Sequence, residues 1–171
     1  FAVAFHPVDG ISSLGAERVE FLLSANAGEP LKPLEKVASG GEMSRIMLAM
    51  KAMFAKGDAI ETLIFDEIDT GISGRIASVV GEKMVRIARD HQVLCVTHLP
   101  QIAAMADAHY LVEKSETDGH ARTSLRALTL QERYVQVAAM MSGAGQSAAA
   151  LEHAKELVDS CAAAKAEGKI G

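Results

Sequence analysis

The sequence predicts an α/β fold: a mostly parallel sheet flanked by helices, with an antiparallel hairpin at its edge. Two observations support this prediction. Residues 62–65 and 93–96 form short apolar runs typical of strands buried on both faces, and helical periodicity surrounds both runs. Right-handed crossovers between parallel strands place the helices on the faces of the sheet. With 171 residues, 49% of them hydrophobic, the chain 1–171 is long enough for about one domain with its own core.

The N-terminal part, residues 1–33, predicts an antiparallel flap. Residues 1–5 and 18–23 have the composition of short strands, and the turn-rich pairs Asp9-Gly10 and Leu14-Gly15 lie between them. The two prolines at positions 30 and 33 disfavour a helix there.

An amphipathic helix is expected just after Gly41. Its apolar face consists of Met43, Ile46, Met47, Met50 and Phe54.

Residues 34–130 are expected to form the core of the domain, and residues 131–171 its C-terminal helices. After the strand at 62–65, a helix is expected from about Ser73, and a short helix at 101–106 follows the strand at 93–96. The inward residues of the helix from Ser73 are predicted to be Ile76, Val80, Met84 and Ile87. Residues 110–114 and 123–128 predict a hairpin that turns at Asp118-Gly119. Helices near 131–141 and 147–164 close the chain.

The composition excludes several classes of protein. A net charge of -5 gives no general attraction to nucleic acid or to anionic membranes. Two cysteines without disulfide or zinc spacing indicate a reducing compartment, and we expect a cytoplasmic protein. The longest apolar stretch is far shorter than the roughly 20 residues that a membrane span requires, so no membrane partner is expected.

Polar residues follow both predicted parallel strands. Asp66 and Glu67 end the first strand, and Thr97 and His98 end the second. Ligands bind beyond the carboxyl ends of such strands. A carboxylate at Asp66 can hold Mg²⁺, often through water, while the neighbouring Glu67 can accept a proton from an attacking water. The alternative is that these acids only mark where a strand meets solvent.

A second polar segment, Ser39-Gly40-Gly41-Glu42, precedes the first long helix. Two glycines let the backbone approach an anion, and the helix N-terminus offers unpaired N–H groups there. The alternative is a serine-glycine turn with an N-cap. The order of this loop, the acid pair and His98, at short spacings, favours a functional interpretation.

These segments together resemble ABC-type ATPases. Residues 37–45 are similar to the signature motif, residues 62–67 to the Walker B strand, residues 68–71 to the D-loop, and His98 to the switch histidine. Within that superfamily, Glu42 and residues 66–72 and 97–103 most resemble the RecN family of bacterial DNA-repair proteins. That family is related to the structural-maintenance-of-chromosomes (SMC) proteins. The resemblance covers nearly the whole chain and is weakest at the Ala-rich C-terminus.

The resemblance implies the C-terminal lobe of an ABC-type head in the P-loop NTPase superfamily, with ATP and Mg²⁺ as cofactors. It implies that a second head forms a homodimer with this one and that nucleotide lies between them. DNA double-strand break repair and recombination would then involve the full-length, nucleoid-associated protein, because no DNA contact is evident in this chain. By this resemblance Asp66 binds Mg²⁺ through water, Glu67 polarises the attacking water, and His98 contacts the γ-phosphate. Asp69 shapes the dimer seam. The ATP of the other head is bound by Ser39, Gly40, Gly41 and Glu42.

One expected element is absent from the sequence. The phosphate-binding Walker A loop needs Gly-x-x-x-x-Gly-Lys-Ser/Thr, and the only Gly-Lys pair, Gly168-Lys169, has Ala163 and Ile170 at the other two positions. We therefore expect a partner lobe elsewhere in a longer protein, as the start at Phe1 also suggests, and no ATP turnover by this chain alone. Two alternatives stay open: a transporter nucleotide-binding subunit, which commonly has glutamine at position 42, and a non-catalytic dimerisation module.

Overall fold

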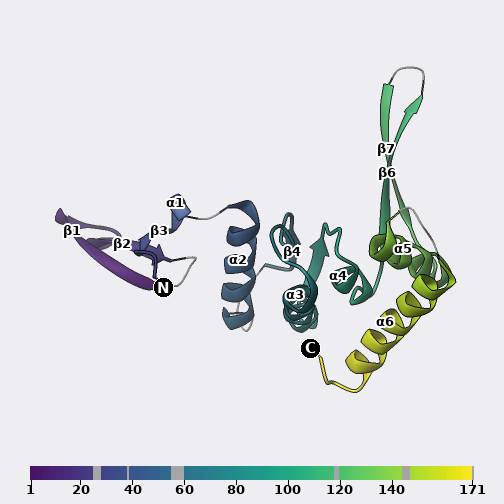
Figure 1. Ribbon diagram of the computed structural model, residues 1–171. Helices are drawn as coiled ribbons and strands as arrows, with labels where there is room; N and C mark the ends of the chain where they lie inside the picture. The colour runs from purple at the N-terminus through teal and green to yellow at the C-terminus, as the bar shows by residue number, and fades with distance from the viewer. Residues whose placement is uncertain (25–27, 38, 55–59, 118–119, 144–146, 171) are drawn as a thin grey trace.

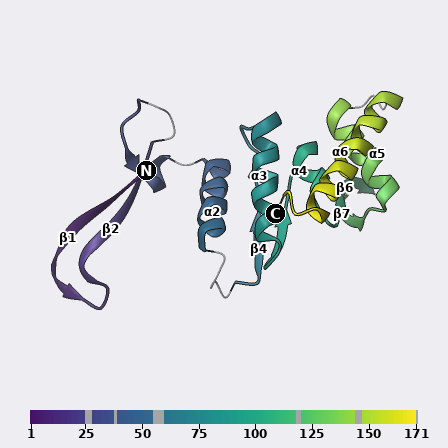
Figure 2. The same ribbon diagram turned by 90° about the horizontal axis from the view of Figure 1, so that it is seen from below.

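The computed structural model describes residues 1–24, 28–37, 39–54, 60–117, 120–143 and 147–170. Its elements follow one another along an elongated molecule, in the same order in both views (Figures 1 and 2). A strand flap lies at one end, two helices and a projecting hairpin lie at the other, and a small parallel sheet with its helices lies between them. The α/β class predicted from the sequence is confirmed.

The flap consists of β1 (Ala2–Ser12), β2 (Gly15–Leu23) and the two-residue β3 (Lys32–Pro33), all antiparallel. Its first two strands are longer than predicted, because Asp9-Gly10 lies within β1 at a register irregularity and does not form the turn. The turn lies between Ser12 and Gly15, where the Ser12 hydroxyl accepts from the Leu14 N–H at 3.1 Å and donates to the Gly15 carbonyl at 3.0 Å. A one-turn helix that the sequence did not predict, α1 (Leu34–Val37), follows.

The central layer pairs β4 (Thr62–Phe65) with β5 (Gln92–Cys95) in parallel. Three helices pack with it: α2 (Gly40–Phe54), α3 (Gly74–Ile87) and the short α4 (Pro100–Ala104). They bury one face of the sheet in a common core. Its buried members are Leu48, Phe65, Ile68, Ala77, Val80, Met84, Ile87 and Ile102.

The opposite face of this sheet is open, so the prediction of strands buried on both faces is wrong for this chain. Ile64 is 70% exposed and Val96 is 62% exposed, and Leu94, paired with Ile64, is exposed beside them. Among the described residues the parallel sheet has two strands, and the other two sheets are antiparallel. The apolar composition predicted the positions of the two strands, but no residue in the described part of the chain covers this face.

Two predicted helix faces also need correction. In α3, Val80, Met84 and Ile87 are buried as predicted, but Ile76 is 58% exposed. Ala77 takes its place, because it lies on the side of α3 that faces the core. In α2 the buried apolar side chain is that of Leu48, which the predicted apolar face did not include, while Met47 and Met50 from that face are exposed.

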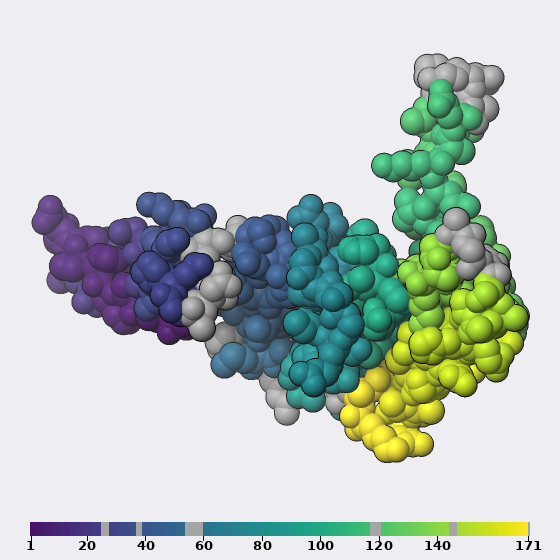
Figure 3. All heavy atoms as spheres, in the orientation of Figure 1, coloured from purple at the N-terminus to yellow at the C-terminus, as the bar shows by residue number. Residues whose placement is uncertain are grey.

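The C-terminal elements lie close to their predicted positions, but among the described residues the hairpin forms a sheet of its own and not an edge of the parallel sheet. Strands β6 (Tyr110–Thr117) and β7 (His120–Ala127) form the antiparallel hairpin, which projects away from the body (Figures 1 and 3). Its expected turn at Asp118-Gly119 lies outside the described residues. Helices α5 (Leu130–Ser142) and α6 (Ala148–Ala166) form a second core with α4. In the part of the chain that the structure describes, no helix is both long and apolar enough to cross a membrane.

Candidate nucleotide site

The polar residues predicted from the sequence gather at the carboxyl end of the parallel sheet. Because β4 and β5 run in the same direction in direct register, the residues that follow them emerge at one edge. Asp66 and Glu67 follow β4 directly and are both exposed, and His98 follows β5 with an exposed side chain. This edge therefore presents two carboxylates and one imidazole to solvent.

Glu67 has an unusual backbone conformation. Its φ angle is 56°, which makes it the only non-glycine residue of positive φ among those described, and such a conformation costs energy for a side chain with a β-carbon. The Asp66 carboxylate accepts the Glu67 N–H at 2.9 Å, and the Glu67 carbonyl accepts the Thr70 N–H at 3.0 Å. We call residues Asp66 to Thr70 the acid turn. These bonds hold the Glu67 backbone in the strained conformation, while its side chain is exposed.

Asp69 lies inside the molecule, only 3% exposed. Its carboxylate accepts the Thr97 hydroxyl at 2.6 Å and the His98 N–H at 2.8 Å, and the His98 ring nitrogen Nδ1 lies 3.1 Å from the same oxygen. Burial raises the pKa of this carboxyl, but the bonds from Thr97 and His98 and the charge of His98 outweigh burial and leave the pKa below its usual value. Asp69 thus ties the acid turn to the end of β5, while its predicted role at a dimer seam stays a prediction.

The signature loop begins α2. The Ser39 hydroxyl accepts the Glu42 N–H at 3.4 Å, the Glu42 carboxylate accepts the Ser39 N–H at 3.0 Å, and the Ser39 carbonyl accepts the Met43 N–H at 2.9 Å. This reciprocal pattern is a capping box. The N-cap interpretation therefore describes the loop in this structure, and phosphate binding by Ser39 to Glu42 stays a prediction. Ser39 and Gly40 are exposed, so the loop remains accessible.

The signature loop lies against the acid turn of the same chain. A β-carbon added to Gly41 would lie 2.8 Å from the Glu67 carbonyl oxygen and 3.0 Å from the Thr70 β-carbon, so only glycine permits this approach. A β-carbon on Gly40 would clash with the Glu67 carboxylate, which is the end of a flexible side chain. Gly41 consequently has a packing role within the chain, which the sequence interpretation did not include, whereas a side chain at Gly40 would only displace the Glu67 carboxylate.

This edge of the sheet can supply only part of the ligands that Mg²⁺ needs. Among the described residues, no cluster of three histidine, cysteine, aspartate or glutamate side chains could hold a metal ion. Mg²⁺ in nucleotide sites is typically held by one or two carboxylates together with phosphates and waters. One oxygen of the exposed Asp66 carboxylate accepts the Glu67 N–H, so Asp66 fits the role of a single carboxylate ligand.

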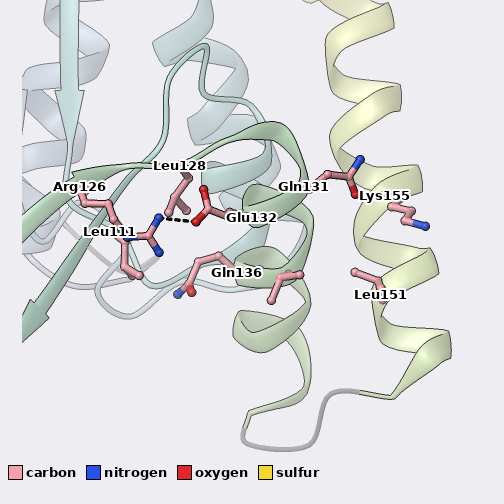
Figure 4. A pocket seen from close by; sticks show the side chains of 9 residues that line it. Leu111, Arg126, Leu128, Gln131, Glu132, Gln136, Leu151 and Lys155 are labelled. Atoms are coloured by element: carbon pink, nitrogen blue, oxygen red, sulfur yellow. Dashed lines mark hydrogen bonds and ion pairs between the residues drawn. The ribbon is translucent and has the colours of Figure 1, made fainter.

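A separate pocket lies between the base of the hairpin and the C-terminal helices (Figure 4). Arg126 and Glu132 form an ion pair at its wall. The pocket includes none of the predicted site residues. The remaining residues that line it are Leu111, Leu128, Gln131, Val135, Gln136, Leu151 and Lys155.

Ser44 and Arg45, which the sequence analysis placed in the signature motif without a role of their own, contact the acid turn. The Ser44 hydroxyl donates to the Asp66 carbonyl at 2.8 Å, and Arg45 Nη1 donates to the carbonyls of Ile68 at 3.1 Å and Thr70 at 2.8 Å. These contacts join residues 22 to 25 positions apart in the sequence. Because their acceptors are backbone carbonyls, no pattern of side chains signals them.

The chain was compared with known protein families, curated proteins and solved structures. No family model matches. One chain, solved in work on ATP-driven dimerization and DNA-stimulated activation of SMC ATPases, aligns over 77% of this chain and 76% of its own length. Its TM-score of 0.43 and 21% identity are too low to establish a shared fold.

Curated relatives are much more similar. This chain is 51% identical over 145 residues to the DNA repair protein RecN of Halalkalibacterium halodurans, covering 85% of this chain and 26% of the relative. It is 44% identical over 158 residues to RecN of Bacillus subtilis, with 92% and 27% covered. RecN of Treponema pallidum is 49% identical over 144 residues, with 84% and 25% covered. The chain thus spans about a quarter of the length of these relatives, and identity at this level over most of its residues shows that it belongs to the RecN family.

Proposed function

We propose that this chain is the C-terminal lobe of a RecN-like ATPase head that acts in DNA double-strand break repair and recombination. The observation that carries the proposal is 44–51% identity to RecN proteins over 84–92% of the chain. The grouping of Asp66, Glu67 and His98 at one sheet edge supports it. Action on DNA belongs in this proposal to the complete protein, in the cytoplasm and at the nucleoid.

Each residue at the sheet edge has one role in the proposed reaction. Asp66 helps to hold Mg²⁺, which when bound neutralises charge on the ATP phosphates. Glu67 accepts the proton of the attacking water, and His98 contacts the γ-phosphate. The exposure of all three residues supports these roles. The bonds from Asp69 to Thr97 and His98 hold the backbone on which His98 is mounted.

The signature loop serves a different nucleotide in this proposal. Ser39, Gly40, Gly41 and Glu42 bind the γ-phosphate of ATP held mainly by a second head, so that a homodimer encloses two nucleotides. Support comes from the helix N-terminus of α2, whose 15 residues give it a full macrodipole, and from the exposure of Ser39 and Gly40.

The α- and β-phosphates require a partner lobe. The sequence contains no Walker A loop, and the open face of the parallel sheet exposes Ile64, Leu94 and Val96. A contiguous apolar patch on a sheet face is a surface that a neighbouring layer covers. We propose that the Walker A lobe of the same protein covers this face and completes the nucleotide site. This chain alone is then inactive.

The proposal is tested in the complete protein with Ser39→Arg. The bulky side chain stands where the signature loop meets the γ-phosphate of the other head, so ATP-dependent crosslinking of the heads and hydrolysis should both be lost. ATP binding by the same head should be retained, because in this proposal the phosphates of that ATP are held mainly by the Walker A lobe. If Ser39→Arg heads close and hydrolyse ATP like wild type, the assignment of the signature loop is wrong. ATP turnover by this chain alone, above that of its Glu67→Gln variant, would contradict the need for a partner lobe.

A further inference from the structure

The acid turn is attached to helix α2 through three hydrogen bonds from two adjacent side chains. Ser44 donates to the carbonyl of Asp66, and Arg45 donates through Nη1 to the carbonyls of Ile68 and Thr70. Ser44 and Arg45 are half-buried; the bond from Arg45 to Ile68 is part-buried, whereas the bonds to Asp66 and Thr70 are exposed. The guanidinium is planar, permanently charged and rich in donors, which suits it to bind two carbonyls at once.

The carbonyls of the acid turn divide into two alternating sets. Those of Glu67 and Asp69 accept N–H groups from within the loop, those of Thr70 and Ile72 respectively. Those of Asp66, Ile68 and Thr70 point the other way and accept from α2. Each carbonyl of the turn thus has a partner, and three of the five partners belong to Ser44 and Arg45. Without Arg45, the carbonyls of Ile68, a core residue, and of the exposed Thr70 would both lose their donor within the chain.

Glu67 lies between two anchors of this turn. On one side Arg45 and Ser44 hold it to α2, and on the other Asp69 holds it to Thr97 and His98 at the end of β5. The positive φ of Glu67 is a conformation that persists only where the surroundings hold it. Release of one anchor allows the backbone to relax toward an ordinary φ and moves the carboxylate away from its present direction.

We propose that Arg45 is a positioning residue for hydrolysis: it fixes the acid turn, and with it the Glu67 carboxylate, to the signature helix of the same head. This inference rests on the proposed function. It makes α2 the link between the two nucleotide sites, because the signature loop at its start contacts one nucleotide and the acid that it holds acts on the other. Closure of the signature loop on one ATP then helps to set the acid at the second site.

The test uses the complete protein and compares Arg45→Ala, Arg45→Lys and Ser44→Ala with wild type. Measured quantities are kcat and KM for ATP hydrolysis, the Kd for ATP, and the melting temperature. Arg45→Ala should lower kcat by roughly 10- to 100-fold, as expected for two charge-assisted hydrogen bonds, with KM and Kd changed less than about threefold. Arg45→Lys keeps the charge and one donor direction and should recover part of the loss. Ser44→Ala, a smaller change, should lower kcat by about 2- to 10-fold.

Arg86→Ala is the matched control, because Arg86 is exposed in the last turn of α3, whereas the acid turn is bound to α2 and the end of β5. It should leave kcat unchanged. If the fall in kcat in Arg45→Ala only equals the fraction of unfolded protein, or if KM rises while kcat stays constant, Arg45 has a structural role and the inference is overturned. If Arg45→Ala folds poorly, Ser44→Ala decides: wild-type kcat in that variant also overturns it. Glu67→Gln distinguishes a failure of this inference from a failure of the proposed function. If Glu67→Gln hydrolyses ATP like wild type, the proposed function itself is wrong.

Discussion

Replacing Asp69 by asparagine removes the charge that joins the acid turn to the end of β5. The carboxylate is 3% exposed and receives the Thr97 hydroxyl at 2.6 Å and the His98 N–H at 2.8 Å on the same oxygen. An amide oxygen can accept the same two donors, but it carries no charge, and its NH₂ group needs an acceptor in a place where the carboxylate needed none. Asp69→Asn therefore keeps the shape of the side chain but weakens its hydrogen bonds with Thr97 and His98.

The size of the effect follows from these bonds. A hydrogen bond to a charged group contributes about 1.5 to 3 kcal/mol, and a neutral one about 1 kcal/mol. Weakening two such bonds and burying an NH₂ donor should cost about 2 to 4 kcal/mol in the free energy of unfolding. For a chain of this length each kcal/mol lowers the melting temperature by roughly 2 to 4 °C, so we expect a fall of about 5 to 15 °C.

The effect should depend on pH in a defined direction. The pKa of Asp69 is lowered in the folded chain, so its charge stabilises the fold fully above the unfolded pKa of about 3.9 and this stabilisation is lost as pH falls through the folded value. The gap in stability between wild type and Asp69→Asn should shrink as the pH falls below about pH 4.

Thermal unfolding of the 171-residue chain, followed by circular dichroism, measures both effects. Asp90→Asn is the matched control, because Asp90 is exposed just after α3 and should change stability by less than about 0.5 kcal/mol. An Asp69→Asn variant that melts with wild type at pH 7 would refute the anchoring role of this carboxylate. A gap that grows on acidification would show that the sign of the pKa shift is wrong.

Two further predictions concern a helix cap and the open face. Thr129→Ala should lower the stability of the chain by about 1 kcal/mol in thermal unfolding, because it removes the capping box of α5. Ser73→Ala is the control and should be nearly neutral, because the Ser73 side chain makes no capping bond to α3. Equal effects of the two substitutions would contradict the assigned capping role of Thr129. Ile64→Asp should scarcely change the melting of this chain, where Ile64 is 70% exposed, but in a binding assay it should weaken association with a separately produced Walker A lobe by at least about tenfold. Unchanged association would show that the lobe does not cover this face.

Elements with their own periodicity could be predicted from the sequence. The strand at Thr62–Phe65, the helix that starts after Ser73 and the two C-terminal helices lie close to their predicted positions. The position of the acids at one sheet edge followed from parallel pairing alone. In each case the pattern is local, or depends on a single general rule of sheet topology.

The errors have physical causes that a single sequence does not carry. Apolar character at Ile64 and Val96 predicts that both are buried, but none of the residues that the structure describes covers them. Asp9-Gly10 has turn composition, yet pairing with β2 continues past it through an irregular register. Arg45 reaches backbone carbonyls that lie 23 and 25 residues away, and acceptors of that kind leave no mark on composition or spacing.

The most direct test of the proposed ATPase is Glu67→Gln in the complete protein, with ATP binding and single-turnover hydrolysis measured on the same preparation. The amide keeps the size of the side chain but cannot accept the proton of the attacking water. ATP affinity should stay within about threefold of wild type, while hydrolysis should fall roughly 10²- to 10⁴-fold, the usual contribution of a positioned general base. That range corresponds to about 3 to 5 kcal/mol of barrier. Hydrolysis at the wild-type rate, with ATP bound as tightly, would contradict the assignment of this chain as the lobe that supplies the catalytic base.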